Sequence, residues 1–316
     1  MTPGTSTLPH VLSGTLKHID DPVAGRVSYY VDGPAPGTEP NSNDPPLLLV
    51  HSINASASAH EAKPIFDAYK KHRQVFALDL PGFGHSERSD RTYDQSLMVA
   101  AIHALIKEIA SEQDKHRIDA LAVSLSCEFI AQAALEYPDF FRTLALVSPT
   151  GFAKIAETKG PPEANCGRPG VLRFLQTPYI GQGLFKLLSS APVIRFFLKK
   201  TWGRKEIDEE FFETSCRMVE VSGAQHAPFH FISGYLFSAD ILTTFKALDH
   251  PVWLSHGVRG DFNDFSKTDS IAEMPNWRIT EFQTGALPYF EVTEDFLSKH
   301  KEFLESAEST KVDAAD

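Results

Sequence analysis

The stretch that decides the fold reads Ala120-Leu121-Ala122-Val123-Ser124-Leu125-Ser126-Cys127-Glu128-Phe129. Its apolar first half predicts a buried strand, and the residues after Ser124 predict a helix. Small residues, Ala122 and Ser126, stand two positions on either side of Ser124, as a very tight strand-to-helix turn requires. Such a turn raises the Ser124 hydroxyl beside the free N–H groups of a helix N-terminus. Ser124 is therefore a candidate nucleophile, and a helix-capping serine is the alternative interpretation.

Strands and helices alternate on both sides of this stretch. Further buried strands are predicted at 47–50, 74–80, 144–147, 252–255 and 277–282, helices at 62–71, 95–111 and 293–304, and an N-terminal β pair at 14–19 and 26–32. This order predicts an α/β fold with a mostly parallel central sheet flanked by helices. The alternation stops in the Phe-rich segment 152–240. We therefore predict a core of residues 1–151 and 241–306, an inserted helical cap of residues 152–240, and a flexible tail of residues 307–316.

The composition is that of a soluble globular protein. The 316 residues are 42% hydrophobic, and 30 Lys and Arg stand against 41 Asp and Glu, a net charge of −11. This balance argues against binding to nucleic acid or to an anionic membrane. The three cysteines, Cys127, Cys166 and Cys216, are scattered and make no disulfide framework. We expect a cytoplasmic protein without a targeting segment or stable membrane insertion, whose oligomeric state the sequence leaves open.

Two other segments extend the pattern around Ser124. Val50-His51-Ser52-Ile53 follows one predicted strand, and Asp79-Leu80-Pro81-Gly82-Phe83-Gly84-His85-Ser86 follows the next. With the Ser124 turn, these segments resemble the α/β-hydrolase superfamily over residues 47–151 and 251–304. The resemblance implies a nucleophile elbow at Ser124 and an oxyanion hole made by the N–H groups of Ile53 and Leu125. Ser52 departs from the glycine that usually follows the histidine.

The resemblance also indicates where the other two members of a catalytic triad belong. The acid should follow the strand at 252–255, where Asp261 fits best and Asp264 is second. The histidine belongs in a Gly-His-x-Pro-x-x-Glu context, and residues 285–291 match it except that Ala286 holds the histidine position. Alanine cannot accept the serine proton. Three explanations stay open: another residue is the base, the protein has given up hydrolysis, or the alanine is an engineered substitution.

Other histidines are considered as a replacement base or as metal ligands. His51 and His256 follow the carboxyl ends of predicted strands and are the alternative bases, although the resemblance gives His51 a scaffold role. His226 and His230 are four residues apart, but Pro228 lies between them and no third ligand is near, so we expect no metal site and no cofactor. Five other histidines are predicted to lie at the surface: His10, His18, His72, His116 and His300.

The cap contributes many aromatic side chains, which should pack on the core and in part line an apolar substrate pocket: Phe174, Phe185, Phe196, Phe197, Phe211, Phe212, Phe229, Phe231 and Phe237, with Trp202 and Tyr235. The basic, amphipathic segment 193–202 is interpreted as a packed lid helix rather than a lipid contact. The predicted function is hydrolysis of a hydrophobic carboxylic ester, or a related acyl compound, through Ser124. The alternative is a non-hydrolytic or inactive protein on the same fold.

Overall fold

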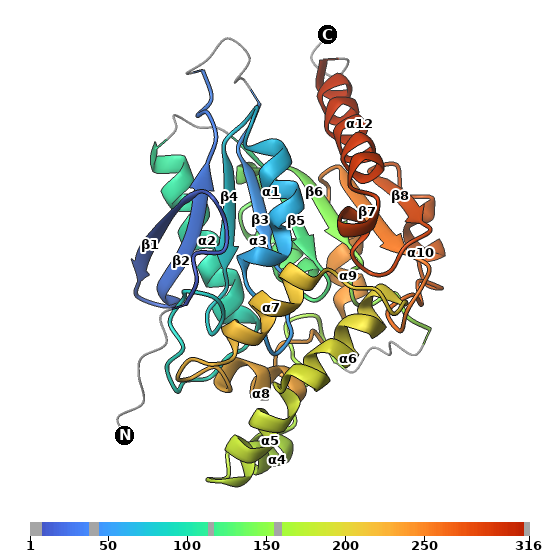
Figure 1. Ribbon diagram of the computed structural model, residues 1–316. Helices are drawn as coiled ribbons and strands as arrows, with labels where there is room; N and C mark the ends of the chain where they lie inside the picture. The colour runs from blue at the N-terminus through green and yellow to red at the C-terminus, as the bar shows by residue number, and fades with distance from the viewer. Residues whose placement is uncertain (1–7, 38–43, 113–116, 155–159, 313–316) are drawn as a thin grey trace.

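A central sheet of eight strands organises the chain, in the order β1-β2-β4-β3-β5-β6-β7-β8 (Figure 1). The computed structural model describes residues 8–37, 44–112, 117–154 and 160–312. The strands are β1 (Thr15–Asp21), β2 (Gly25–Asp32), β3 (Leu47–Val50), β4 (Val75–Asp79), β5 (Ile118–Val123), β6 (Phe141–Val147), β7 (Val252–Gly257) and β8 (Trp277–Phe282). The pairs β1–β2 and β2–β4 are antiparallel, and all other pairs are parallel. The predicted α/β fold and the N-terminal β pair are confirmed.

Helices cover both faces of the sheet. One face carries α2 (Gln95–Glu112), α3 (Ser126–Glu136), α9 (Ile241–Lys246) and α10 (Asp269–Ala272); the other carries α1 (Lys63–Tyr69), α11 (Pro288–Glu291) and α12 (Thr293–Val312). Short 3-10 turns lie at Ala59–Ala62 and Pro138–Phe140. Within β5, Ala120 and Ala122 pack on the first face, whereas Leu121 and Val123 pack on the second. Burial on both sides explains why these strands are continuously apolar.

Between β6 and α9, where the sequence predicts the cap, the structure describes five helices. They are α4 (Pro169–Leu175), α5 (Ile180–Leu188), α6 (Ala191–Trp202), α7 (Glu209–Met218) and α8 (His226–Ile232). In Figure 1, α4 and α5 lie at the end of this insertion farthest from the sheet. Within the described residues of the insertion, the only β pairing is an isolated bridge between Asn165 and Ser238. None of the described helices is long and apolar enough to cross a membrane.

Two features near the C-terminus differ from the prediction. Helix α12 continues to Val312 instead of ending near residue 304, and Ala307, at the start of the predicted tail, is buried. Residues 313–316 of that tail lie outside the described residues. His300 is fully buried rather than at the surface, because its ring stacks on Trp253 and its Nδ1 lies 2.8 Å from the Tyr69 hydroxyl. Burial lowers the pKa of His300 to about 3, so this ring stays neutral. His10 and His72 are exposed as predicted, and His116 lies outside the described residues.

Candidate active site

Ser124 occupies a strained turn between β5 and α3. Its φ is 55°, a left-handed conformation that costs a non-glycine residue about 1–2 kcal/mol. The Ser124 N–H donates to the carbonyl of Val147 at 2.8 Å, and its carbonyl accepts from the Cys127 N–H at 3.1 Å. Ser124 is partly exposed, although Val123 and Leu125 on either side are buried. The backbone therefore pushes the serine out of the core at the start of α3.

The turn that follows β3 lies beside Ser124. Strand β3 pairs with β5 so that Val50 is opposite Ala122, and the Ser126 hydroxyl donates to the carbonyl of His51 at 2.6 Å. Among the described residues, the N–H groups of Ile53 and Leu125 find no hydrogen-bond acceptor. Both residues are buried. Unpaired N–H groups on buried residues are rare, and they suit a ligand oxygen.

Glu61 fixes the same turn, and sequence reasoning missed it. The backbone N–H of Ser52 donates to Glu61, its hydroxyl donates at 2.9 Å, and the Asn54 amide donates at 3.3 Å. Ser52 is not among the described residues with positive φ, so this turn does not need the glycine that the resemblance leads one to expect. Burial raises the pKa of Glu61 to about 7. Its position ten residues after His51 gives no sequence signal of this contact.

His51 is held on both sides of its ring. Its Nε2 accepts from the Leu80 N–H at 3.1 Å, so Nδ1 carries the proton and donates to the carbonyl of Ser52 at 2.6 Å. No ring nitrogen is left to take the proton of Ser124. The prediction of His51 as an alternative base is therefore wrong, and its role is to join the two turns.

His256 lies at the end of β7, two strands away from β5. Two strand spacings amount to about 10 Å. Its ring stacks on Phe265 with centroids 4.0 Å apart, and its Nδ1 lies 3.1 Å from the carbonyl of Gly257. No hydrogen bond joins it to Ser124 within the described structure. His256 as a base stays a prediction that requires the ring to leave Phe265.

Asp261, the predicted acid, faces the cap. Its carboxylate lies 3.1 Å from the Lys200 ammonium, and its N–H donates to the carbonyl of Lys200 at 3.2 Å. The side chain is 55% exposed, unlike an acid buried behind an imidazole. Asp264 is also exposed and accepts from the N–H of Lys154 at 2.9 Å. The structure thus brings neither carboxylate into contact with residue 286.

Ala286 lies in a buried loop next to the Ser124 turn. Its carbonyl accepts from the Ser148 hydroxyl at 2.7 Å, and Ser148 directly follows Val147, the acceptor for Ser124. Glu291 supports the loop by accepting from the N–H of Gly285 at 2.7 Å. The loop predicted to hold the histidine is thus beside the elbow, and it has an alanine at the histidine position.

The same glutamate connects this loop to the rest of the site. Arg259, in the loop after β7, donates to Glu291, and Arg204 of the cap lies 3.4 Å from it. Glu291 is only 5% exposed in its side chain. Glu291 therefore joins three parts of the structure: the loop after β7, the loop that contains Ala286, and the cap.

The C-terminal turn of α6 closes directly on Gly285. A Cβ at this position would lie 2.5 Å from the Thr201 carbonyl oxygen and 2.6 Å from the backbone of Trp202. We expect Gly285→Ala to force α6 away from the loop and to lower the unfolding free energy by about 1–3 kcal/mol, measured by urea denaturation.

Gly183 provides the matched control for that substitution. It lies in α5, and a Cβ there would meet nothing within 4 Å. Gly183→Ala is expected to raise the unfolding free energy by roughly 0.5–1 kcal/mol, because alanine favours a helix. Equal effects of the two substitutions would contradict the close contact between α6 and Gly285.

Glu128, in the first turn of α3, connects the core to the cap. Its carboxylate accepts from the hydroxyl of Thr150, from the N–H of Ser238 at 2.8 Å and from the amide of Gln95 at 3.3 Å. Burial raises the pKa of Glu128 to about 7. Sequence reasoning missed this role too, although its place four residues after Ser124 is a usable signal.

His226 and His230 form no metal site with other described residues. No group of three His, Cys, Asp or Glu side chains in the described ranges could hold an ion. Helix α8 contains Pro228 without interruption, so the proline does not separate the two histidines as the sequence argument supposed. His230 is buried against Tyr93 and Tyr235.

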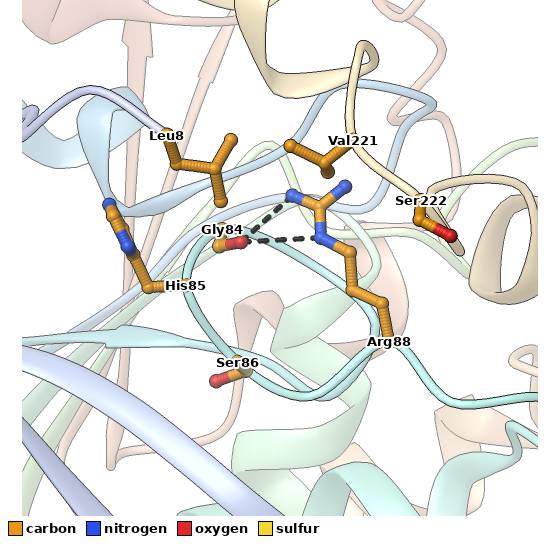
Figure 2. A pocket seen from close by; sticks show the side chains of 7 residues that line it. All are labelled: Leu8, Gly84, His85, Ser86, Arg88, Val221 and Ser222. Atoms are coloured by element: carbon orange, nitrogen blue, oxygen red, sulfur yellow. Dashed lines mark hydrogen bonds between the residues drawn. The ribbon is translucent and has the colours of Figure 1, made fainter. Parts of the chain in front are cut away.

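An open pocket with a volume of about 540 Å³ lies on the Asp79–Ser86 turn (Figure 2). Its lining residues are Leu8, Gly84, His85, Ser86, Arg88, Val221 and Ser222. The Arg88 guanidinium donates to the carbonyl of Gly84 at 2.8 and 3.2 Å, and to the carbonyl of Met218 at 2.9 Å. Desolvation lowers the pKa of Arg88 to about 10. This arginine fastens the turn to the cap, and none of the lining residues belongs to the Ser124 site.

Comparisons with known proteins agree with this architecture. A family model described as alpha/beta hydrolase fold matches residues 45–169. No curated protein sequence matches significantly. Among solved structures, a probable hydrolytic enzyme from Pseudomonas aeruginosa PAO1 is similar with a TM-score of 0.71, at 19% identity over 93% of this chain and 95% of that one.

Two further solved structures differ in their chemistry. A serine hydrolase involved in carbazole degradation has a TM-score of 0.68, at 14% identity over 93% of this chain and 99% of that one. The Cif epoxide hydrolase from Acinetobacter nosocomialis has a TM-score of 0.67, at 18% identity over 92% and 89%. At such identities the likeness shows the fold, and the chemistry has to be argued from the site.

Proposed function

We propose that this chain, a member of the α/β-hydrolase fold superfamily, is a hydrolase of a hydrophobic carboxylic ester or related acyl compound. The substrate binds with its carbonyl group at Ser124, which is the nucleophile. The observation that carries the proposal is the strained turn at Ser124 beside the unpaired N–H groups of Ile53 and Leu125. Donors placed in this way stabilise the oxygen on which negative charge develops when the serine attacks.

The missing step is removal of the serine proton. In the attack, the Ser124 oxygen bonds to the carbonyl carbon, the carbonyl electron pair moves onto oxygen, and the hydroxyl proton must pass to a base. The side chain of Ala286 cannot accept this proton, and the Asp261 carboxylate forms an ion pair with Lys200. We therefore expect slow turnover, at the level that an oxyanion hole and binding alone provide, about 10³–10⁴ over water.

A second candidate function is acyl-compound binding without hydrolysis. The observation in its favour is that the Ser124 hydroxyl makes no hydrogen bond to any described residue. A serine at its ordinary pKa is a weak nucleophile without an adjacent base. On this alternative, the strained turn serves only to orient a bound carbonyl group.

The test is hydrolysis of a short-chain p-nitrophenyl ester by the wild type and by Ala286→His. A histidine here lacks a triad acid. In a well-studied serine protease the cost of losing the histidine exceeds that of losing the acid by about 70-fold, so we expect a gain in kcat of about that size. Ser124→Ala in the Ala286→His background should abolish the gain, and a fluorophosphonate probe should label Ser124 faster in Ala286→His than in the wild type.

The outcomes separate the two candidates. If Ala286→His is folded but gains neither turnover nor labelling, Ser124 is not a nucleophile and the binding function stands. Rapid turnover by the wild type would contradict the proposed lack of a base. In that case His256→Ala, compared with the exposed His72→Ala as control, would show whether His256 supplies it.

A further inference from the structure

The outer helices of the cap combine exposed apolar side chains with unpaired positive charge. We propose that the face formed by α4, α5 and α6, the cap tip, docks on the surface of an anionic lipid bilayer. This proposal is independent of the reaction at Ser124. It concerns where the protein binds, and it can be tested without any substrate.

Large apolar side chains of the cap tip point to solvent. Tyr179 is 88% exposed and Leu187 is 62% exposed, and four others are exposed by 49% to 56%: Phe174, Ile180, Phe196 and Phe197. Phe174, Phe196 and Phe197 were predicted to pack the cap or line a pocket, and for these three side chains that prediction is wrong. Helix α5 packs on both α4 and α6, so the three helices form one continuous surface. A large exposed apolar patch of this kind marks an interaction surface.

The charge of the cap tip is opposite to that of the chain. Residues 164–205 contain no Asp or Glu and eight Lys or Arg, in a protein with a net charge of −11. Three of the eight are paired: Arg195 with Glu209, Lys200 with Asp261 and Arg204 with Glu291. The other five make no salt bridge with any residue that the structure describes: Arg168, Arg173, Lys186, Lys199 and Lys205. The whole-chain balance, which argued against an anionic membrane, therefore hides a local positive surface.

Geometry favours a planar partner over a pocket-shaped one. In Figure 1, α4 and α5 protrude at the end of the cap away from the sheet, where a flat surface can reach them. Tyr179, between these helices, has a strained backbone with φ 65°, and its side chain is exposed to solvent. Tyrosine is enriched where apolar chains meet lipid headgroups, and lysine and arginine stems extend along the same boundary. An anionic bilayer matches the apolar area and the positive charge together.

Vesicle co-sedimentation tests the proposal. The wild-type protein should bind phosphatidylcholine vesicles that contain phosphatidylglycerol, bind pure phosphatidylcholine vesicles much less, and be released by high salt. Lys186→Gln with Lys199→Gln should weaken binding about 25-fold, because each basic residue near an anionic surface strengthens binding about fivefold. Lys71→Gln with Lys301→Gln, exposed lysines of the core, is the matched control and should bind like the wild type.

The apolar contribution has its own variant. Leu187→Ser should weaken binding to the same vesicles about tenfold, whereas Val23→Ser, 58% exposed on the core, should not. Circular dichroism and melting temperature verify that all variants are folded. Absence of binding to phosphatidylglycerol vesicles, or equal binding by test and control variants, would overturn the proposal. So would self-association in analytical ultracentrifugation that Leu187→Ser abolishes, because the surface would then bind a second copy of the chain.

Discussion

Asp119→Ala is expected to lower the free energy of unfolding by about 3–5 kcal/mol, the cost of breaking a buried ion pair from one side. Asp119 is fully buried at the start of β5 and accepts from Arg73 at 2.5 Å, from two nitrogens of Arg142 at 2.6 and 2.7 Å, and from the Thr143 hydroxyl at 2.6 Å. These positive neighbours hold the pKa of Asp119 below its usual range despite its burial. Its removal leaves the Arg73 charge, which is 2% exposed, without this carboxylate. Urea denaturation at neutral pH measures the effect.

Two controls separate the buried charge from other consequences of the substitution. Asp119→Asn retains an acceptor of the same shape and should cost less than the alanine variant. Asp139→Ala removes a carboxylate that is 97% exposed and lies 3.7 Å from Arg117, and it should change stability by no more than about 1 kcal/mol. A loss below 1 kcal/mol for Asp119→Ala would mean that Arg73 and Arg142 are not held by this aspartate.

The sequence predicts correctly those elements whose pattern of apolar and polar residues matches their burial in the folded protein. Strand β5 is apolar at each position that meets a helix layer, apart from Asp119, and it ends at Val123, directly before Ser124, as the sequence predicts. The Ser124 turn was predictable because small neighbours are a steric requirement of the turn itself. His300 was not predictable, since its burial depends on Trp253 and Tyr69, which lie far away in the chain.

In the candidate site too, the features set by local sequence were predictable, and those set by contacts with distant segments were not. Resemblance located the loops around Ser124, Asp261 and Ala286, but which partner Asp261 takes depends on how α6 docks, and no local pattern encodes that docking. Glu61 and Glu128 were missed for a related reason. From sequence alone a glutamate is expected to be exposed to solvent. Here the hydrogen-bond donors that accompany the burial of Glu61 and Glu128 come from other segments of the chain.

Glu128→Gln is expected to stabilise the protein above neutral pH by up to roughly 3 kcal/mol and to flatten its pH dependence. Burial raises the pKa of Glu128 from 4.5 to about 7, so the folded protein holds this proton more tightly than the unfolded chain does. The stability contribution of the protonated group is therefore fully present below pH 4.5 and is lost as the pH rises to about 7. One pKa unit corresponds to about 1.4 kcal/mol, which gives the total.

Glutamine reproduces the protonated carboxyl at this position. Its amide N–H can donate to the Thr150 oxygen, while its carbonyl oxygen still accepts from the N–H of Ser238 and the amide of Gln95. Unfolding free energies at pH 5, 6, 7 and 8 should differ least between the two proteins at pH 5, differ more as the pH rises to about 7, and stay apart at pH 8.

The remaining pH dependence of Glu128→Gln should come largely from Glu61, whose pKa is also raised to about 7. Glu128→Ala is the contrasting variant: it leaves the Ser238 N–H unpaired beside the cap and should lose about 1–3 kcal/mol at pH 5. An unchanged fall in stability between pH 5 and 8 in Glu128→Gln would show that Glu128 does not titrate in this range. The carboxylate between core and cap would then be ionised throughout, and its three donors, rather than a proton, would compensate its burial.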